Sequence, residues 1–277
     1  MQSDYIHQMF SVEGQVIVIT GGGGILCGTM ARELAKAGAK IAVLDIQLPA
    51  AQKVVADITA AGGEAIAIET DVLSKESLQQ SAEQVLARYG RVDALINGAG
   101  GNKKQATTAP DLSFFDLPQD AFQCVFNLNF LGMLLASQVY GKLLCEQGEG
   151  AILNIASVNA FRALTKIPAY SAAKAAVKNF TEWMAVHVAQ EYSPNVRVNA
   201  IAPGFFLTEQ NRFLLTDEKT GERTLRGQTI INHTPMGRYG EPEELMSTVI
   251  WLLAPASRFV HGVTVAVDGG FCIFSGV

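Results

Sequence analysis

The feature that most constrains the fold of this chain is a regular alternation of short apolar runs with longer amphipathic stretches. Seven runs rich in β-branched and other apolar residues are predicted strands: 16–20, 41–45, 65–69, 94–97, 151–157, 196–202 and 263–267. They are apolar at nearly every position, as expected for parallel strands covered by helices on both faces. Between them, stretches such as 76–90 and 175–192 carry apolar residues at helical spacing. This alternation predicts an α/β fold, a doubly wound (Rossmann) domain with a mostly parallel seven-stranded sheet.

The chain of 277 residues contains no internal repeat, low-complexity segment or linker that would mark a second domain. We therefore expect one Rossmann-type dehydrogenase domain over residues 1–277. One connection is unusually long: residues 204–234 separate the sixth predicted strand from the next helix. Connections of this length inside a compact domain often cover a functional site, so this segment is either a substrate loop or a solvated insertion.

Composition excludes several classes of protein. The net charge of −5 argues against a nucleic-acid partner, because phosphate binding usually needs a basic face. No apolar run approaches the roughly 18 residues of a membrane helix, and the first residues lack the pattern of a secretory signal. The four cysteines form no CxxC pair and no metal-ligand spacing. We expect a cytoplasmic protein with no metal site and no membrane partner.

The stretch 16–45 has the order strand, glycine loop, helix and strand that binds dinucleotides. A TGxxxGxG pattern would place glycine at positions 25 and 27, where this chain has Ile25 and Cys27. Glycines 21 to 24 can still form the turn and let the backbone approach a pyrophosphate. The helix expected from about Leu26 would direct its N-terminal N–H groups at the phosphates. The predicted contacts are Gly21, Gly24, Ile25 and Leu26.

Cys27, followed by Gly28, is predicted to be a small residue that lets this helix pack on the sheet. A thiol with a depressed pKa at a helix N-terminus is the alternative interpretation.

Asp45 ends the second predicted strand, 25 residues after the start of the glycine loop at Thr20. A carboxylate there accepts hydrogen bonds from an adenosine ribose and repels a 2′-phosphate. No lysine or arginine follows within "DIQLPA". The sequence therefore predicts NAD as cofactor, with NADP the weaker alternative. An ordinary turn residue at the strand end is the structural alternative.

A catalytic constellation is predicted between residues 157 and 174. Tyr170 and Lys174 are four residues apart on a helix and share a face. A phenol has a pKa of about 10, and a neighbouring ammonium lowers it toward the range useful for proton transfer. Ser157 is expected to end a strand and to hydrogen-bond a substrate oxygen. A Tyr-x-x-x-Lys pair alone is usually fortuitous, but here it follows the glycine loop and Asp45 in order.

With these residues the chain resembles the short-chain dehydrogenase/reductase family along essentially its whole length. Further stretches match family motifs: "DV" at 71–72, "NGAG" at 97–100, "NFLG" at 129–132, "APG" at 202–204 and "VDGG" at 267–270. The resemblance implies hydride transfer between a nicotinamide and a carbonyl carbon, with Tyr170 as general acid/base, Lys174 adjusting Tyr170 and holding the nicotinamide ribose, and Ser157 positioning the carbonyl. It implies that Asn129 holds a water between Lys174 and solvent. The further cofactor contacts it implies are Asp71, Val72, Asn97, Gly98, Ala99, Tyr170, Lys174, Pro203, Gly204 and Thr208.

Amide and cationic side chains cluster in the segments that the resemblance places beside the substrate. The candidates are Asn102, Asn159, Arg162, Gln210, Asn211 and Arg212. Amides suit sugar hydroxyls and a guanidinium suits a carboxylate, so a small-molecule sugar acid is the predicted substrate. Solvated surface charge is the alternative for Arg212, and an apolar groove near "PGFFL" leaves a fatty-acyl ketone open.

Several of these strings, including "NGAGGNKKQATT" and "VDGGFCIFSGV", are similar to the D-mannonate oxidoreductases (fructuronate reductases) within the family. That similarity implies interconversion of D-fructuronate and D-mannonate in hexuronate metabolism, with Arg162 or Arg212 holding the carboxylate. The alternatives are a reductase of another ketone, such as a 3-oxoacyl group or a neutral sugar, and a non-catalytic NAD-binding module. The family resemblance also implies a homo-oligomer, commonly a tetramer, with contacts through helices at 119–147 and 170–191.

Overall fold

The computed structural model describes residues 2–207, 215–216 and 221–276. Each predicted strand is present: β1 (Val16–Thr20), β2 (Lys40–Asp45), β3 (Glu64–Glu69), β4 (Ala94–Asn97), β5 (Gly150–Ile155), β6 (Val196–Pro203) and β7 (Thr264–Val267). The strands pair in the order β3-β2-β1-β4-β5-β6-β7, and every neighbouring pair is parallel. The predicted doubly wound α/β sheet is confirmed, and it is parallel throughout.

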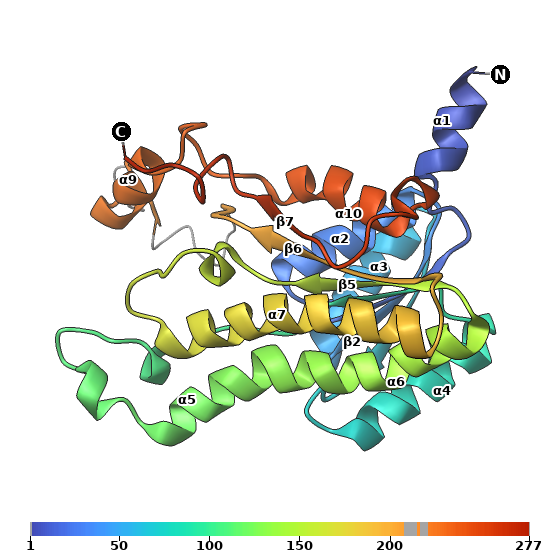
Figure 1. The fold of residues 1–277 in the computed structure, drawn as a ribbon, viewed down its shortest axis with the longest axis horizontal. Helices are drawn as coiled ribbons and strands as arrows, with labels where there is room; N and C mark the ends of the chain where they lie inside the picture. The colour runs from blue at the N-terminus through green and yellow to red at the C-terminus, as the bar shows by residue number, and fades with distance from the viewer. Residues whose placement is uncertain (1, 208–214, 217–220, 277) are drawn as a thin grey trace.

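Helices cover both faces of this sheet (Figure 1). The described residues form α1 (Gln2–Phe10), α2 (Ile25–Lys36), α3 (Leu48–Ala60), α4 (Lys75–Tyr89), α5 (Gln119–Phe126), α6 (Gly132–Gln147), α7 (Pro168–Glu191), α9 (Leu225–Asn232) and α10 (Met246–Leu253). Of these, α1 projects away from the sheet and α9 lies near the C-terminus (Figure 1). Alternate residues of β1 point to opposite faces. Ile17 and Ile19 pack in one core cluster with α2, α3 and α10, whereas Val16 and Val18 pack in another with α4, α6 and α7. Burial on both faces explains why the strands are apolar at nearly every position.

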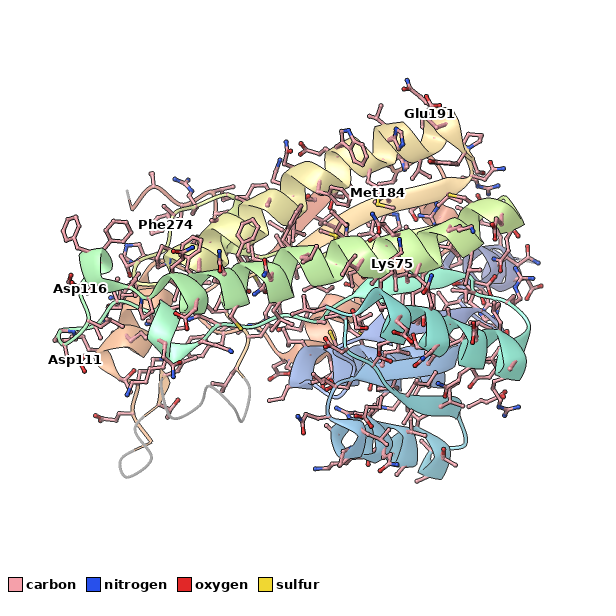
Figure 2. All side chains as sticks on the ribbon, turned by 90° about the horizontal axis from the view of Figure 1, so that it is seen from below. Lys75, Asp111, Asp116, Met184, Glu191 and Phe274 are labelled. Atoms are coloured by element: carbon pink, nitrogen blue, oxygen red, sulfur yellow. The ribbon has the colours of Figure 1, made fainter. Side chains whose placement is uncertain are left out.

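Figure 2 looks onto the layer formed by α4, α6 and α7, with Lys75 on α4 and Met184 and Glu191 on α7. The segment Gln119–Gln147, which joins α5 to α6, has a mean hydropathy of 1.3 and is long and apolar enough to cross a membrane. The segment contains no uninterrupted apolar run of about 18 residues, as expected from the sequence, because polar residues such as Asn127, Asn129 and Gln138 interrupt it. In the fold this segment packs against α4, α7, β4 and β5, and buries Tyr140 and Leu144 in the core.

The connections that follow the carboxyl ends of the strands gather at one end of the molecule (Figure 1). The segment between β4 and α5 projects there, with Asp111 and Asp116 at its tip (Figure 2). The long connection 204–234 is not wholly irregular, since it contains α9. The expected strand 151–157 is shorter than predicted: β5 ends at Ile155, and Ser157 begins a short turn, η4 (Val158–Ala160).

Candidate active site

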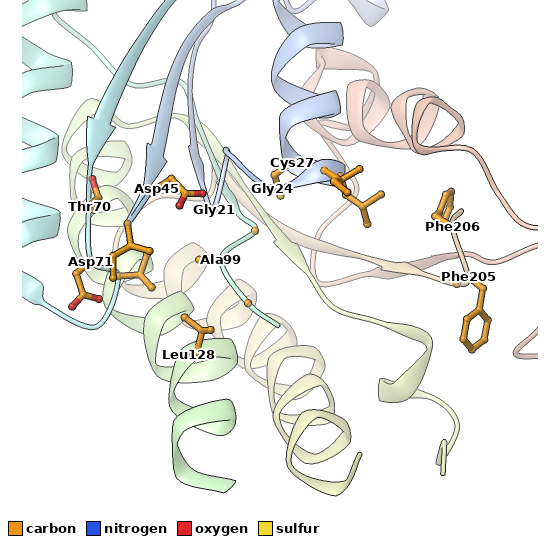
Figure 3. A pocket seen from close by; sticks show the side chains of 17 residues that line it. Gly21, Gly24, Cys27, Asp45, Thr70, Asp71, Ala99, Leu128, Phe205 and Phe206 are labelled. Carbon is orange, nitrogen blue, oxygen red and sulfur yellow. The ribbon is translucent and has the colours of Figure 1, made fainter. Parts of the chain in front are cut away.

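A cavity of about 480 Å³ opens at the carboxyl ends of the central strands (Figure 3). Ten of the predicted cofactor residues line it: Gly21, Gly24, Ile25, Leu26, Asp45, Asp71, Val72, Gly98, Ala99 and Gly204. They come from loops that are far apart in the sequence and meet where the strand order reverses on either side of β1. Such a crevice is where open α/β sheets bind their ligands.

The glycine loop needs glycine for two distinct reasons. Gly21 has φ +65°, a left-handed conformation, and a β-carbon there would lie 2.7 Å from the Cα of Ala99. Gly24 is the N-cap of α2 and provides no side-chain cap, so the first N–H groups of the helix remain available at the cavity wall. The helix begins at Ile25, one residue before the predicted start. The loop thus retains an anion-binding helix N-terminus without glycine at position 25.

Cys27 packs α2 against the loop after β4, and Gly28 lets α2 approach α3 closely. The Cys27 side chain fills the space beside Gly98, and a β-carbon on Gly28 would lie 3.2 Å from Cγ2 of Val54 on α3. Burial raises the pKa of the Cys27 thiol to about 12, so it is neutral at physiological pH. Its burial against Gly98 supports the interpretation of Cys27 as a packing residue rather than a reactive thiol.

Asp45 holds the glycine loop as well as the cavity wall. Its Oδ2 accepts a hydrogen bond from the Gly23 N–H at 3.0 Å, and its Oδ1 accepts one from the Gln47 N–H at 2.9 Å. The carboxylate therefore stands at the cavity in a fixed orientation, with each oxygen retaining a further acceptor position. It is more than a turn residue at the end of β2.

Some predicted cofactor residues do not line this cavity. Asn97 directs its amide into the core, where Nδ2 donates to Ser137 Oγ at 2.9 Å and to Asn154 Oδ1 at 2.8 Å. Pro203 precedes the lining residue Gly204 and is itself not part of the wall, and neither Tyr170 nor Lys174 is part of it. Thr208 lies outside the described residues.

Ser157, Tyr170 and Lys174 are brought together as predicted. Lys174 is 5% exposed; its Nζ donates to the Ile155 carbonyl at 2.7 Å and lies 5.5 Å from the centre of the Tyr170 ring. Burial lowers the pKa of Lys174 to about 8. Burial also raises the pKa of Tyr170 above its ordinary value, while a hydrogen bond from Ser157 acts in the opposite direction. In the protein without ligand the Lys174 ammonium therefore does not bring the phenol pKa down as expected from the sequence.

Asn129 lies behind the cavity wall in η3 (Asn127–Leu131), a π-helical turn between α5 and α6. Its Oδ1 accepts from the Gly101 N–H at 3.1 Å, and its Nδ2 donates to the Gly101 and Val125 carbonyls at 2.6 and 2.8 Å. A β-carbon on Gly100 would lie 2.5 Å from Asn129 Oδ1 and 3.5 Å from Lys174 Nζ. Gly100 lines the cavity, so this glycine separates the cavity from Asn129 and Lys174.

The predicted substrate residues are distributed unevenly. Asn102 lines a second cavity of about 450 Å³ that shares Gly100 and Leu128 with the first. Arg162 is exposed, and its Nε donates to the Cys272 carbonyl at 2.6 Å, which ties it to the C-terminal segment. Asn159 is 7% exposed and bonds to two serines. Gln210, Asn211 and Arg212 lie outside the described residues.

Sequence reasoning missed the lining residues Ile46, Thr70 and Leu128. Thr70 and Ile46 adjoin predicted contacts at strand ends, so their position alone was a usable signal. Leu128 has no distinctive spacing, because an apolar wall residue looks like any core residue in the sequence. Gly100 lies in the "NGAG" stretch, and Phe205 and Phe206 form the apolar part of "PGFFL". Phe205 packs edge-to-face on Phe271, with ring centres 5.1 Å apart.

Comparison with known proteins agrees with this geometry. A family model described as enoyl-(acyl carrier protein) reductase matches residues 26–272. An uncharacterized oxidoreductase, UxuB, of Bacillus subtilis is 50% identical, covering 96% of this chain and 98% of the relative. The 2-dehydro-3-deoxy-D-gluconate 5-dehydrogenase of Escherichia coli is 34% identical over 95% of this chain and 97% of its own length. A crystal structure of a candidate D-mannonate oxidoreductase from Haemophilus influenzae with bound NAD is 45% identical, with a TM-score of 0.90, covering 96% and 98% of the two chains.

Proposed function

Because the chain belongs to the short-chain dehydrogenase/reductase family, we propose that it interconverts a keto-uronate and a sugar acid with NAD(H). It is an oxidoreductase acting on a CH–OH group or the corresponding ketone. D-Fructuronate and D-mannonate are the proposed pair. The observation that carries the proposal is the grouping of Ser157, Tyr170 and Lys174, with Lys174 Nζ directly behind Gly100 of the cavity wall.

The cavity fits a dinucleotide in three respects. Gly21 leaves room for close backbone approach, the uncapped start of α2 offers N–H groups to a pyrophosphate, and Asp45 offers acceptors to a ribose. A negative carboxylate at this place disfavours the 2′-phosphate of NADP. The relative from Haemophilus influenzae holds NAD, which supports the same choice here.

When bound, NADH supplies the hydride, and the side chains of this chain manage the proton and the charge. Tyr170 gives its phenolic proton to the carbonyl oxygen of the substrate, and Ser157 donates a hydrogen bond to the same oxygen. The Lys174 ammonium stabilises the phenolate that results. Because burial raises its pKa, Tyr170 holds its proton at neutral pH and can act as the acid in reduction. In oxidation the same groups work in reverse.

Asn129 is proposed to support this centre from behind Gly100. Its side-chain amide is hydrogen-bonded to Gly101 and Val125, which fixes its orientation. A water shared with Lys174 would therefore be bound by a side chain in a fixed position. The proposed carboxylate contacts, Arg162 or Arg212, rest on the sequence. If Arg162 takes part, it does so with its terminal nitrogens, because its Nε bonds to Cys272.

A second candidate is a reductase of an apolar ketone such as a 3-oxoacyl group. Phe205 and Phe206 line the cavity and favour it, because an apolar wall suits an acyl chain. A non-catalytic NAD-binding module is disfavoured, because the triad of Ser157, Tyr170 and Lys174 is complete.

The chain is also proposed to form a homo-oligomer, commonly a tetramer in this family, through α6 and α7. A groove of about 800 Å³ runs between these helices, with Trp183 55% and Tyr192 65% exposed along it. Apolar surface of this kind is typical of protein interfaces. A cytoplasmic location is proposed because all four cysteines are free thiols.

The experiment is NADH consumption by the purified protein with D-fructuronate, with NADPH and a neutral ketose run in parallel. Fast turnover with NADH and D-fructuronate is the expected result. Preference for the neutral ketose would contradict the carboxylate substrate, and preference for NADPH would contradict only the cofactor choice. Turnover of an acyl ketone alone would favour the second candidate.

A further inference from the structure

A short chain of hydrogen bonds connects Ser157 to Asn159 and then to Ser171. The Ser157 hydroxyl donates to Asn159 Oδ1 at 3.2 Å, and the Asn159 N–H donates back to Ser157 Oγ at 3.3 Å. The other end of the amide, Nδ2, donates to Ser171 Oγ at 2.8 Å. Ser171 directly follows Tyr170 in the first turns of α7. The three side chains therefore connect the turn that carries Ser157 to the helix that carries Tyr170.

The Asn159 amide lies between two serine hydroxyls. Its NH₂ group faces Ser171 and its carbonyl oxygen faces Ser157. Asn159 is 7% exposed and Ser157 is 7% exposed, so little solvent competes for these bonds. An amide with both ends engaged inside the protein holds one orientation.

The orientation of the Ser157 hydroxyl matters for the proposed reaction. A serine hydroxyl has one proton and rotates freely unless its neighbours fix it. To stabilise the negative charge that develops on the substrate oxygen, the proton must be directed to that oxygen, and electrostatic catalysis depends on such preorganisation. The Asn159 backbone N–H donates to Ser157 Oγ, and the side-chain Oδ1 accepts the Ser157 proton. The two bonds hold Oγ in one position, from which the proton turns from Asn159 Oδ1 to the substrate oxygen when substrate binds.

Resting on the proposed function, we propose that Asn159 is a positioning residue that acts through Ser157, with Ser171 as its anchor. Asn159 was considered from the sequence as a substrate contact. Both ends of its side chain are hydrogen-bonded to serines. Asn159 therefore affects the reaction by orienting Ser157 and not by contacting the substrate.

The test compares Asn159→Ala in the wild-type protein and in a Ser157→Ala background, using steady-state kinetics with the best ketone substrate found. In the wild-type protein Asn159→Ala is expected to lower kcat by about tenfold, the effect of one ordinary hydrogen bond, with KM changed less than twofold. In the Ser157→Ala background it is expected to lower kcat no further, because its only route of action is gone. A full tenfold loss in both backgrounds, or a rise in KM alone, would overturn the proposal.

Asn199→Ala is the matched control. Asn199 is also a buried amide, bonded to Val260 and Val263, in β6. Its loss is expected to lower the melting temperature and to leave kcat unchanged, which separates destabilisation from positioning. Ser171→Ala should give a smaller loss of kcat than Asn159→Ala, since the amide keeps its bonds to Ser157.

Failure of the Asn159 proposal can be distinguished from failure of the substrate assignment. If D-fructuronate is not reduced but another ketone is, the substrate assignment fails and the Asn159 test proceeds with that ketone. A crystal structure of the Asn159→Ala variant gives a readout that needs no substrate. The proposal expects Ser157 Oγ to occupy more than one rotamer there, and a single rotamer identical to that of the wild type would overturn it.

Discussion

The sulfur of Cys27 occupies the space that a β-carbon on residue 98 would need. The third glycine position of the TGxxxGxG pattern and the second residue of the "NGAG" stretch are therefore in contact across the cavity floor. The larger residue at position 27 is accommodated because position 98 has no side chain. This pair explains how the loop tolerates its departure from the usual glycine pattern.

Gly98→Ala is expected to destabilise the protein by about 1–3 kcal/mol, the usual effect of overpacking. Adding Cys27→Ala should recover part of that loss, because it removes the closest clash; the Thr20 carbonyl, 2.9 Å from the same β-carbon position, remains. Thermal unfolding of the four proteins measures the coupling. Cys27→Ala alone should leave NAD affinity nearly unchanged, and purely additive melting temperatures would contradict the pairing.

Tyr170→Phe is expected to lower kcat by at least ~100-fold, because the phenolic proton is the proposed acid. The phenyl ring still fills the space beside Lys174, so NADH affinity should remain within about threefold of the wild type, a difference below 1 kcal/mol. Stopped-flow turnover and fluorescence titration with NADH measure the two quantities. A variant that turns over at nearly the wild-type rate would exclude Tyr170 as the acid.

The reduction rate should fall as pH rises through about 8. Burial lowers the pKa of Lys174 to about 8, so above this pH its ammonium loses the proton and no longer stabilises the forming phenolate. Tyr170, whose pKa is raised by burial, keeps its proton over the same range. The profile of kcat/KM from pH 6 to 10 reports the free enzyme. A flat profile across pH 8, or a rate that increases there, would contradict this role of Lys174.

Asp45→Ser is expected to reduce the preference for NADH over NADPH. The variant loses a charged acceptor, an effect of about 1.5–3 kcal/mol or roughly 10- to 150-fold in affinity, and it removes the repulsion of a 2′-phosphate. The ratio of kcat/KM for NADH to that for NADPH is the measurement. Since Asp45 also accepts from the Gly23 N–H, a melting curve controls for damage to the loop. An unchanged ratio would show that other residues choose the cofactor.

Trp183→Glu is expected to dissociate the proposed oligomer, because it places a charge in the apolar groove between α6 and α7. Sedimentation velocity at micromolar protein measures the change. Lys53→Glu on α3, on the other side of the sheet, is the control and should leave the assembly intact. A wild-type protein that sediments as a monomer would contradict the prediction at once.

The sheet, the family resemblance and the order of the proposed catalytic residues could all be predicted from the sequence. These are local properties. The pattern of a strand depends on consecutive residues, and Tyr170 and Lys174 share a helix face because they are four residues apart. The glycine loop and Asp45 could be recognised for the same reason. The sequence also predicts that Cys27 is small enough for the close packing of this helix.

The hydrogen-bond partners and the pKa shifts of the side chains could be learned only from the folded structure. Asn97, Asn159 and Arg162 each looked suited to a ligand, yet they bond to core amides, to serines and to the C-terminal segment. The pKa shifts of Tyr170 and Lys174 also depend on burial, which results from contacts between distant segments. A sequence states which groups are available, whereas hydrogen-bond partners and solvation are set by residues that become neighbours only when the chain folds.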